Sequence, residues 1–191
     1  KDHISLFITS PSISPTDFNR IACLWRSWLE IFDVKKFTLI IFDCLNVLTV
    51  TINVLFDPTI ILEKLALMFG CICENDLNKG KTRTDIFSEI LDTIFENFNE
   101  ERFQNKDLAF GMGSFCITLI SLVDQDDGFD TLFNKAFDFA KFCLKHHPLS
   151  GESKSTENER YKITSAFAMS FINKALHTPV FQNKIVDAPF D

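Results

Sequence analysis

Three residues near one end of an apolar stretch have the types and spacing of metal ligands. His146 and His147 follow Cys143 by three and four residues, so a helix would place the cysteine and a histidine on one face. A structural zinc site needs further ligands, and the sequence has no second close cysteine–histidine pair. We therefore predict no metal site, with Cys143 buried and the two histidines at the carboxyl end of a helix, where positive charge is favourable.

Nucleophilic catalysis would need a serine or cysteine activated by a histidine. The four histidines, at 3, 146, 147 and 177, accompany no recognisable nucleophile turn. The sequence GMGSF at 111–115 is not the Gly-x-Ser-x-Gly turn, and it lacks the third glycine and the preceding strand of a dinucleotide loop. We predict no enzyme activity, no catalytic residue, no cofactor and no small-molecule substrate.

Two charged stretches offer other chemistry. DQDDGFD at 124–130 is acidic enough for calcium, but it lacks the glycine and glutamate positions of an EF-hand loop, so we interpret it as an acidic helix start. NKGKTRT at 78–84 is the one basic cluster, which could contact a phosphate or an acidic partner but is interpreted as a solvated loop. The net charge of -7 argues against direct binding to nucleic acid.

Apolar residues recur at three-and-four spacing along most of the chain, which predicts an all-α fold. We expect about seven antiparallel helices, arranged as a short α-solenoid or an irregular helical bundle. Ser14, Pro15 and Asp17 predict the first helix start through a cap, a first-turn proline and a capping-box acid, and Thr156 with Glu159 predicts the last. The expected helices cover about 14–32, 35–56, 57–73, 84–99, 105–123, 128–147 and 156–177.

The segment 35–56 has alternatives. Its length without turn residues favours a helix, while the β-branched run at 47–54 permits strands. The segment is also long enough to span a membrane, but Asp43, Asn46 and Asn53 interrupt it, and an aspartate at mid-membrane costs about 2.5–3.5 kcal/mol. We expect a buried helix or a pair of strands, and no membrane contact.

The almost entirely apolar segment 105–123 is expected to form the most central helix. Gly111 and Gly113 lie within it, and each costs a helix about 1 kcal/mol relative to alanine. Close approach of a neighbouring helix could offset that cost.

The segment 128–147 carries five phenylalanines. On a helix its apolar residues span about 140°, more than the roughly 100° that one neighbour requires. Phe139 and Phe142 lie outside the main band, and we predict that they form a second packing surface, within the chain or against a partner. The expected core residues of this helix are Phe129, Phe133 and Phe137.

Helix starts expected at about 15, 57, 105 and 156 recur at a period near that of two-helix repeat units. Through the segments SPTDFNRIACLWRSWLEIF, DPTIILEKLALMF, TDIFSEILDTIFENF and FDTLFNKAFDFAKFCL, the chain resembles the HEAT and armadillo families of α-solenoids. The resemblance is architectural and covers most of the chain. It implies stacked helix pairs that act as a scaffold.

We divide the chain into an N-terminal extension (1–13), a helical domain (14–177) and a tail (178–191) that packs as an extended arm. Six cysteines, mostly within apolar runs, indicate reduced thiols and an intracellular protein, cytoplasmic or nuclear.

We predict a non-enzymatic scaffold domain of a larger protein, with a protein partner in a hetero-oligomer or a homodimer. The predicted partner-binding residues are Trp25, Trp28, Phe139 and Phe142, because tryptophan and other large apolar side chains serve as interface anchors. The alternatives are a compact bundle whose groove binds a partner helix or a small apolar ligand, and a metal-binding protein or enzyme.

Overall fold

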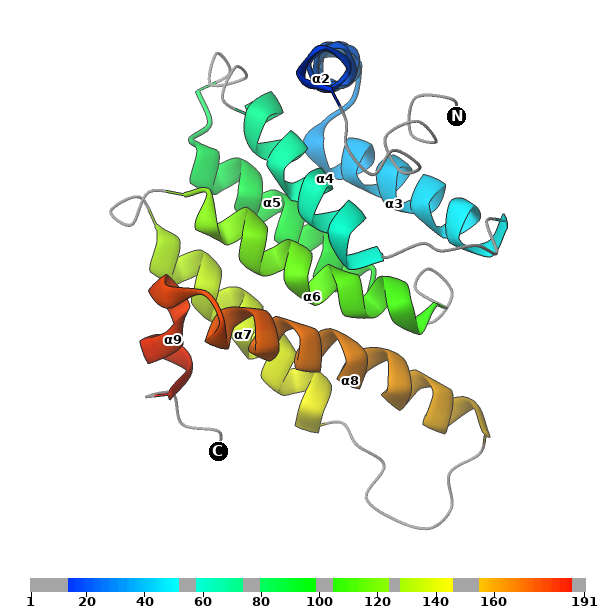
Figure 1. Ribbon diagram of the computed structural model, residues 1–191, viewed down its shortest axis with the longest axis vertical. Coiled ribbons are helices and arrows are strands. Elements are labelled where there is room, and N and C mark those ends of the chain that lie inside the picture. Colours follow the sequence, from blue (N-terminus) through cyan, green and yellow to red (C-terminus); the bar gives the residue numbers. More distant parts are fainter. Residues whose placement is uncertain are drawn as a thin grey trace.

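The computed structural model describes residues 14–51, 58–73, 80–98, 105–123, 128–145 and 155–186, and the regular structure within these ranges is helical (Figure 1). The predicted all-α fold is therefore confirmed. The described residues form eight helices where about seven were expected. They are α2 (Pro15–Ile31), α3 (Val34–Thr51), α4 (Pro58–Cys73), α5 (Arg83–Glu96), α6 (Lys106–Ser121), α7 (Phe129–Lys145), α8 (Ser155–Leu176) and α9 (Pro179–Val186).

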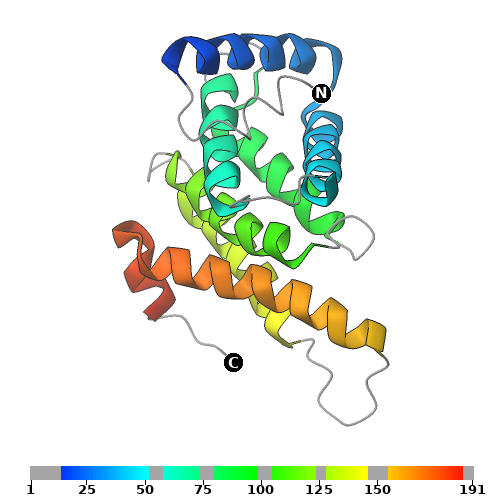
Figure 2. The same ribbon diagram turned by 45° about the vertical axis from the view of Figure 1, so that its right-hand side comes forward.

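Helices α3 to α8 form two layers. In one layer α5 lies between α3 and α7, and in the other α6 lies between α4 and α8 and shares its largest interfaces with them. Figure 1 shows that α4, α6 and α8 run in the same direction while α5 and α7 return. Helix α2 lies across one end, against α3 and α4, and α9 folds back onto α8 at the other end (Figure 2).

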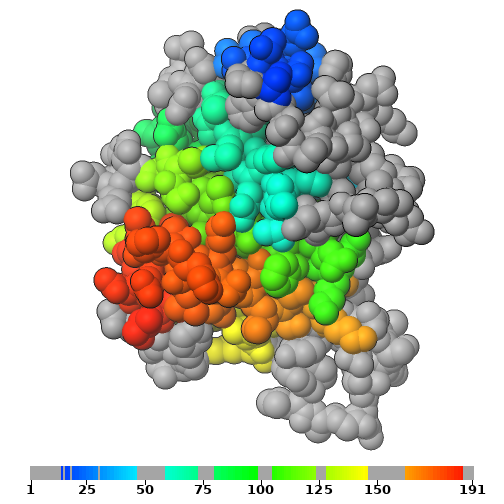
Figure 3. Space-filling view, viewed as in Figure 1, coloured from blue at the N-terminus to red at the C-terminus, as the bar shows by residue number. Residues whose placement is uncertain are grey.

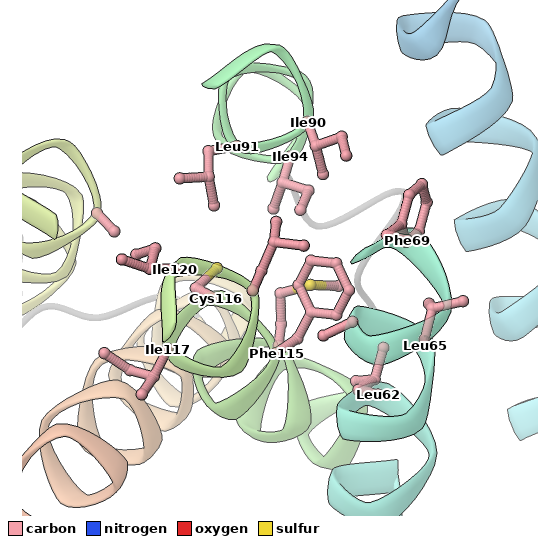
Figure 4. Close-up of a cluster of buried hydrophobic side chains, with 14 of the residues drawn as sticks. Leu62, Leu65, Phe69, Ile90, Leu91, Ile94, Phe115, Cys116, Ile117 and Ile120 are labelled. Carbon is pink, nitrogen blue, oxygen red and sulfur yellow. The ribbon is translucent and has the colours of Figure 1, made fainter. Parts of the chain in front are cut away.

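The core lies between the two layers, where apolar stripes at helical spacing meet. Figure 4 shows side chains of α4, α5 and α6 pointing toward one another, among them Phe69, Ile90 and Phe115. All three are at most 1% exposed, and the rings of Phe69 and Phe115 meet edge to face at a centroid distance of 6.1 Å. Burial of this area supplies most of the driving force for folding.

Segment 35–56 is helical where the structure describes it. Helix α3 runs through Thr51 because Phe37, Ile41 and Leu45, four residues apart, all point into the core. The helix prediction is confirmed up to residue 51, and residues 52–56 lie outside the described ranges. Within those ranges, no helix combines the length and apolar character needed to cross a membrane.

The predicted tail contains a helix, so the extended arm was wrong for residues 179–186. Pro179 occupies the first turn of α9, and Phe181 and Ile185 are buried one turn apart. The ring of Phe181 stacks on Phe129 of α7 at 4.9 Å between centroids. Helix α9 thus covers the ends of α7 and α8.

Polar caps fix the helix starts. Ser14 accepts a hydrogen bond from the backbone N–H of Asp17 at 3.1 Å, as the sequence predicted. Helix α5 begins at Arg83 rather than at residue 84, because Thr82 and Asp85 form a capping box. The Thr82 hydroxyl accepts from the N–H of Asp85, and the Asp85 carboxylate accepts from the N–H of Thr82 at 2.8 Å.

This box makes the stability of α5 depend on pH. Hydrogen bonds from Thr82 hold the pKa of Asp85 below its ordinary value. A depressed folded-state pKa stabilises the protein above the ordinary aspartate range, and that contribution is lost as the pH falls through the folded pKa. We expect Asp85→Asn to be destabilising at pH 7, with the difference in unfolding free energy from wild type shrinking below about pH 4. Urea unfolding at several pH values measures this, and a pH-independent difference would contradict it.

Candidate interaction surface

Large apolar side chains that stay exposed are unevenly distributed over the described residues. Five of them lie on α4, α6 and α8, and their exposed fractions are 38–61%. The layer of α3, α5 and α7 has one, Phe142, and the end helices have the others, Ile31, Val180 and Val186. The five residues are called the apolar face: Ile60, Leu67, Phe110, Met169 and Leu176.

A polar bridge between α4 and α8 lies beside the two exposed apolar residues of α4. Glu63 of α4 reaches Lys174 of α8, with an Oε1–Nζ distance of 2.6 Å, although α6 lies between the two helices. Ile60 and Leu67 lie one turn before and one turn after Glu63, so they point to the same outer side. Figure 3 shows α4, α6 and α8 side by side on this surface.

The outer surface of the other layer is polar and ion-paired. The carboxylates of α5 form ion pairs with lysines of α3, of α7 and of the segment before α5. The amine of Lys35 in α3 lies 2.7 Å from the carboxylate of Glu96, and the amine of Lys135 in α7 lies 2.8 Å from that of Asp92. The hydrogen bond and charge of Glu96 raise the pKa of Lys35 above its ordinary value. These groups line a depression of about 300 Å³ on the surface. Three of its acids, Glu89, Asp92 and Glu96, pair with lysines of the chain, and the fourth, Asp85, accepts hydrogen bonds from Thr82.

The four predicted partner-binding residues lie in different surroundings. Trp25 is 1% exposed and belongs to the core, and Trp28 is half-buried. Phe139 is half-buried with its ring stacked on Phe95 at 4.2 Å. Phe142 is 53% exposed and lies 6.2 Å from the Phe139 ring. Of the four, only Phe142 presents most of its side chain to solvent.

The candidate metal ligands are only partly described. Cys143 is buried, and burial raises the pKa of its thiol to about 12, which disfavours the thiolate that a metal requires. His146, His147 and the acidic loop at 124–127 lie outside the described ranges. In the ranges that are described, no three residues of metal-binding type come together.

Other sequence candidates have structural roles. Gly111 and Gly113 lie in the middle of α6, not in a phosphate-binding loop. In the basic segment, Lys81 pairs with Glu89 at 2.6 Å and the guanidinium of Arg83 donates to the carbonyl of Leu122 at 2.9 Å. The described part of the basic segment, residues 80–84, therefore ties α5 to the end of α6, and residues 78 and 79 lie outside the described ranges.

The sequence did not single out the apolar face. Helices α4 and α6 are apolar on nearly every side, so periodicity alone does not separate the outer residues Leu67 and Phe110 from the buried ones. Only the positions of α4 and α8 on either side of α6 make that distinction.

No protein-family model, curated protein or solved structure matches the chain. The described residues define its class as an all-α, two-layered helical domain with one apolar outer face and one ion-paired outer face.

Proposed function

We propose that the protein is a non-enzymatic scaffold domain that binds a protein partner through the apolar face. The observation that carries this proposal is the concentration of exposed Ile60, Leu67, Phe110, Met169 and Leu176 on three adjacent helices. An exposed apolar patch within a polar surface is typical of interaction sites. The ion-paired outer surface of α5 offers no comparable patch in the described residues.

The arrangement of the helices supports a HEAT- or armadillo-like scaffold. Alternate helices begin at 15, 58, 106 and 155, close to the expected starts, and α4, α6 and α8 occupy equivalent places in one layer. Helix α2 departs from this order because it lies across the end. We propose that the domain belongs to a larger intracellular protein, cytoplasmic or nuclear, and forms a stable hetero-oligomer or a homodimer.

Affinity capture with a matched pair of variants tests this function. Leu67→Asp/Met169→Asp places two charges in the apolar face, and the control Ile31→Asp/Val186→Asp places two charges at residues of α2 and α9 that are 74% and 70% exposed. We expect the double variant to lose about 100-fold or more of its affinity for the partner, since two desolvated carboxylates oppose binding. The control should retain the partner, and circular dichroism should show that both variants fold.

Sedimentation of the purified wild type distinguishes a homodimer from a monomer that needs another protein. A self-association that the double variant abolishes identifies the partner as a second copy. A partner or dimer retained by the double variant at wild-type affinity would reject the apolar face as the binding site.

A further inference from the structure

The apolar face has about the apolar area that one copy contributes to a standard protein dimer. Its five residues are 38–61% exposed, and with roughly 150–250 Å² of surface on each large side chain they present on the order of 400 Å². A two-fold dimer of standard size buries about 800 Å² on each copy, of which about 65% is apolar. The face therefore provides most of the roughly 500 Å² of apolar surface that each copy of such a dimer needs.

A second copy is a partner that brings the same face. Among its described side chains, the layer of α3, α5 and α7 exposes one large apolar residue, Phe142, and the outer surface of α5 is ion-paired. Copies that associate head to tail would need a second apolar patch there to dock on. Two copies related by a two-fold axis use a single patch twice. The distribution of apolar residues therefore favours a closed dimer over an open chain of copies.

The apolar residues on the two helices that flank α6 have matching spacing. Ile60 and Leu67 are seven residues apart on α4, and Met169 and Leu176 are seven residues apart on α8. Each pair therefore spans about 10.5 Å along its helix and points to one side of it. Equal spacing allows the pair on one helix to pack against the pair on the other, provided that the two pairs lie level.

An ion pair shows that they do lie level. Glu63, between the two apolar residues of α4, contacts Lys174 in the last turn of α8 at 2.6 Å. Helices α4 and α8 lie on either side of α6 and run in the same direction (Figure 1). A two-fold rotation about an axis parallel to α6 keeps each residue at its level and exchanges the two sides. It therefore sets Leu67 of one copy beside Leu176 of the other, to within about one turn, 5.4 Å.

Building on the proposed function, we propose that the apolar face binds a second copy of this chain, in a two-fold dimer whose axis runs parallel to α6. Leu67 of each copy packs on Leu176 of the other copy, and Ile60 packs on Met169. Each of these contacts occurs twice in the dimer, so a single substitution weakens two contacts.

Sedimentation equilibrium of the whole chain tests the second copy. We expect a dimer with a dissociation constant of about 1 μM or tighter, since interfaces of standard size have micromolar or higher affinity. Leu67→Asp/Met169→Asp should weaken the dimer about 100-fold or more. The control Ile31→Asp/Val186→Asp changes exposed residues of α2 and α9 and should leave the dissociation constant within about twofold of wild type.

Mixtures of variants test the direction of the axis. Leu67→Glu and Leu176→Lys should each weaken the dimer about tenfold or more, because each places two charges against leucine. When the two variants are mixed, one contact pairs the new carboxylate with the new amine and the other pairs two leucines. The mixed dimer should therefore be about tenfold tighter than the dimer of either variant alone. In the matched mixture of Leu67→Glu with Ile60→Lys the two new charges do not meet, and we expect no such gain.

The outcomes separate this inference from the proposed function. A wild type that stays monomeric up to about 100 μM overturns the dimer. The proposed function then still holds if affinity capture returns a different protein whose binding Leu67→Asp/Met169→Asp abolishes, and it fails if capture returns none. A dimer that this double variant retains uses another surface and overturns both proposals. A gain with Ile60→Lys in place of Leu176→Lys would set α4 against α4 and overturn the proposed axis.

Discussion

Replacing Trp25 by alanine is expected to lower the free energy of unfolding by about 3–5 kcal/mol. The indole is 1% exposed and meets the ring of Phe37 edge to face at 5.8 Å and that of Phe69 at 6.5 Å. It therefore joins α2 to both α3 and α4 at the end of the two layers. Because these aromatic neighbours are themselves buried, they collapse little into the space that the indole leaves.

Urea unfolding of the purified chain measures this cost. Trp28→Ala is the matched control. Because Trp28 is half-buried on the same helix, its replacement should lower the free energy of unfolding clearly less than Trp25→Ala does. Trp25→Phe should recover much of the lost stability by refilling part of the cavity. Equal stability of Trp25→Ala and wild type would place the indole outside the core. The expected loss also means that Trp25→Ala tests folding, and is unsuitable as a probe of partner binding.

The interpretation of Trp25 as a partner anchor rested on the enrichment of tryptophan at protein interfaces. Its spacing with Leu29 correctly indicated an apolar stripe on α2. The sequence did not indicate that α2 crosses the end of the layers, which buries this stripe against α3 and α4. Periodicity identifies the apolar side of a helix, but the orientation of the helix decides whether that side meets the chain or a partner.

Helix starts were predicted well where a cap and a proline coincide. Ser14 with Pro15 gave the start of α2, and the same signal at Thr178 and Pro179 was overlooked at α9. The Thr82 box was missed because the basic residues around it suggested a loop. Local sequence signals were therefore sufficient to predict where helices begin. The apolar face could not be predicted in this way, because it depends on which helices become neighbours.

Phe139 and Phe142 illustrate the same limit. The wide apolar band of α7 correctly implied more than one neighbour, since α7 contacts α5, α6 and α8. The ring of Phe139 lies 4.2 Å from that of Phe95 and 5.2 Å from that of Phe167, measured between centroids. Of the two residues predicted to form a second packing surface, Phe139 therefore packs within the chain. Contact of the other residue, Phe142, with a partner stays a prediction.

Gly113→Ala is expected to destabilise the protein by about 2–3 kcal/mol, although alanine is the better helix former by about 1 kcal/mol. A Cβ atom at this position would lie 2.5 Å from the carbonyl oxygen of Phe167 and 2.5 Å from the nitrogen of Phe171. Both atoms belong to the backbone of α8, so the whole helix would have to move away from α6. The nearby contact between Ser114 and Ser170, at 3.3 Å, would be strained by the same movement.

Gly70→Ala provides the matched control, because Gly70 is a buried helical glycine like Gly113, but a Cβ atom there would approach a single residue. There a Cβ would meet Leu122 Cδ1 at 2.7 Å, the far end of a flexible side chain that can rotate away. We expect Gly70→Ala to be within about 1 kcal/mol of wild type in urea unfolding. If the two variants are equally stable, α6 and α8 tolerate separation. If they differ as expected, Gly113 sets the distance between α6 and α8, and with it the spacing of Phe110 and Met169 on the apolar face.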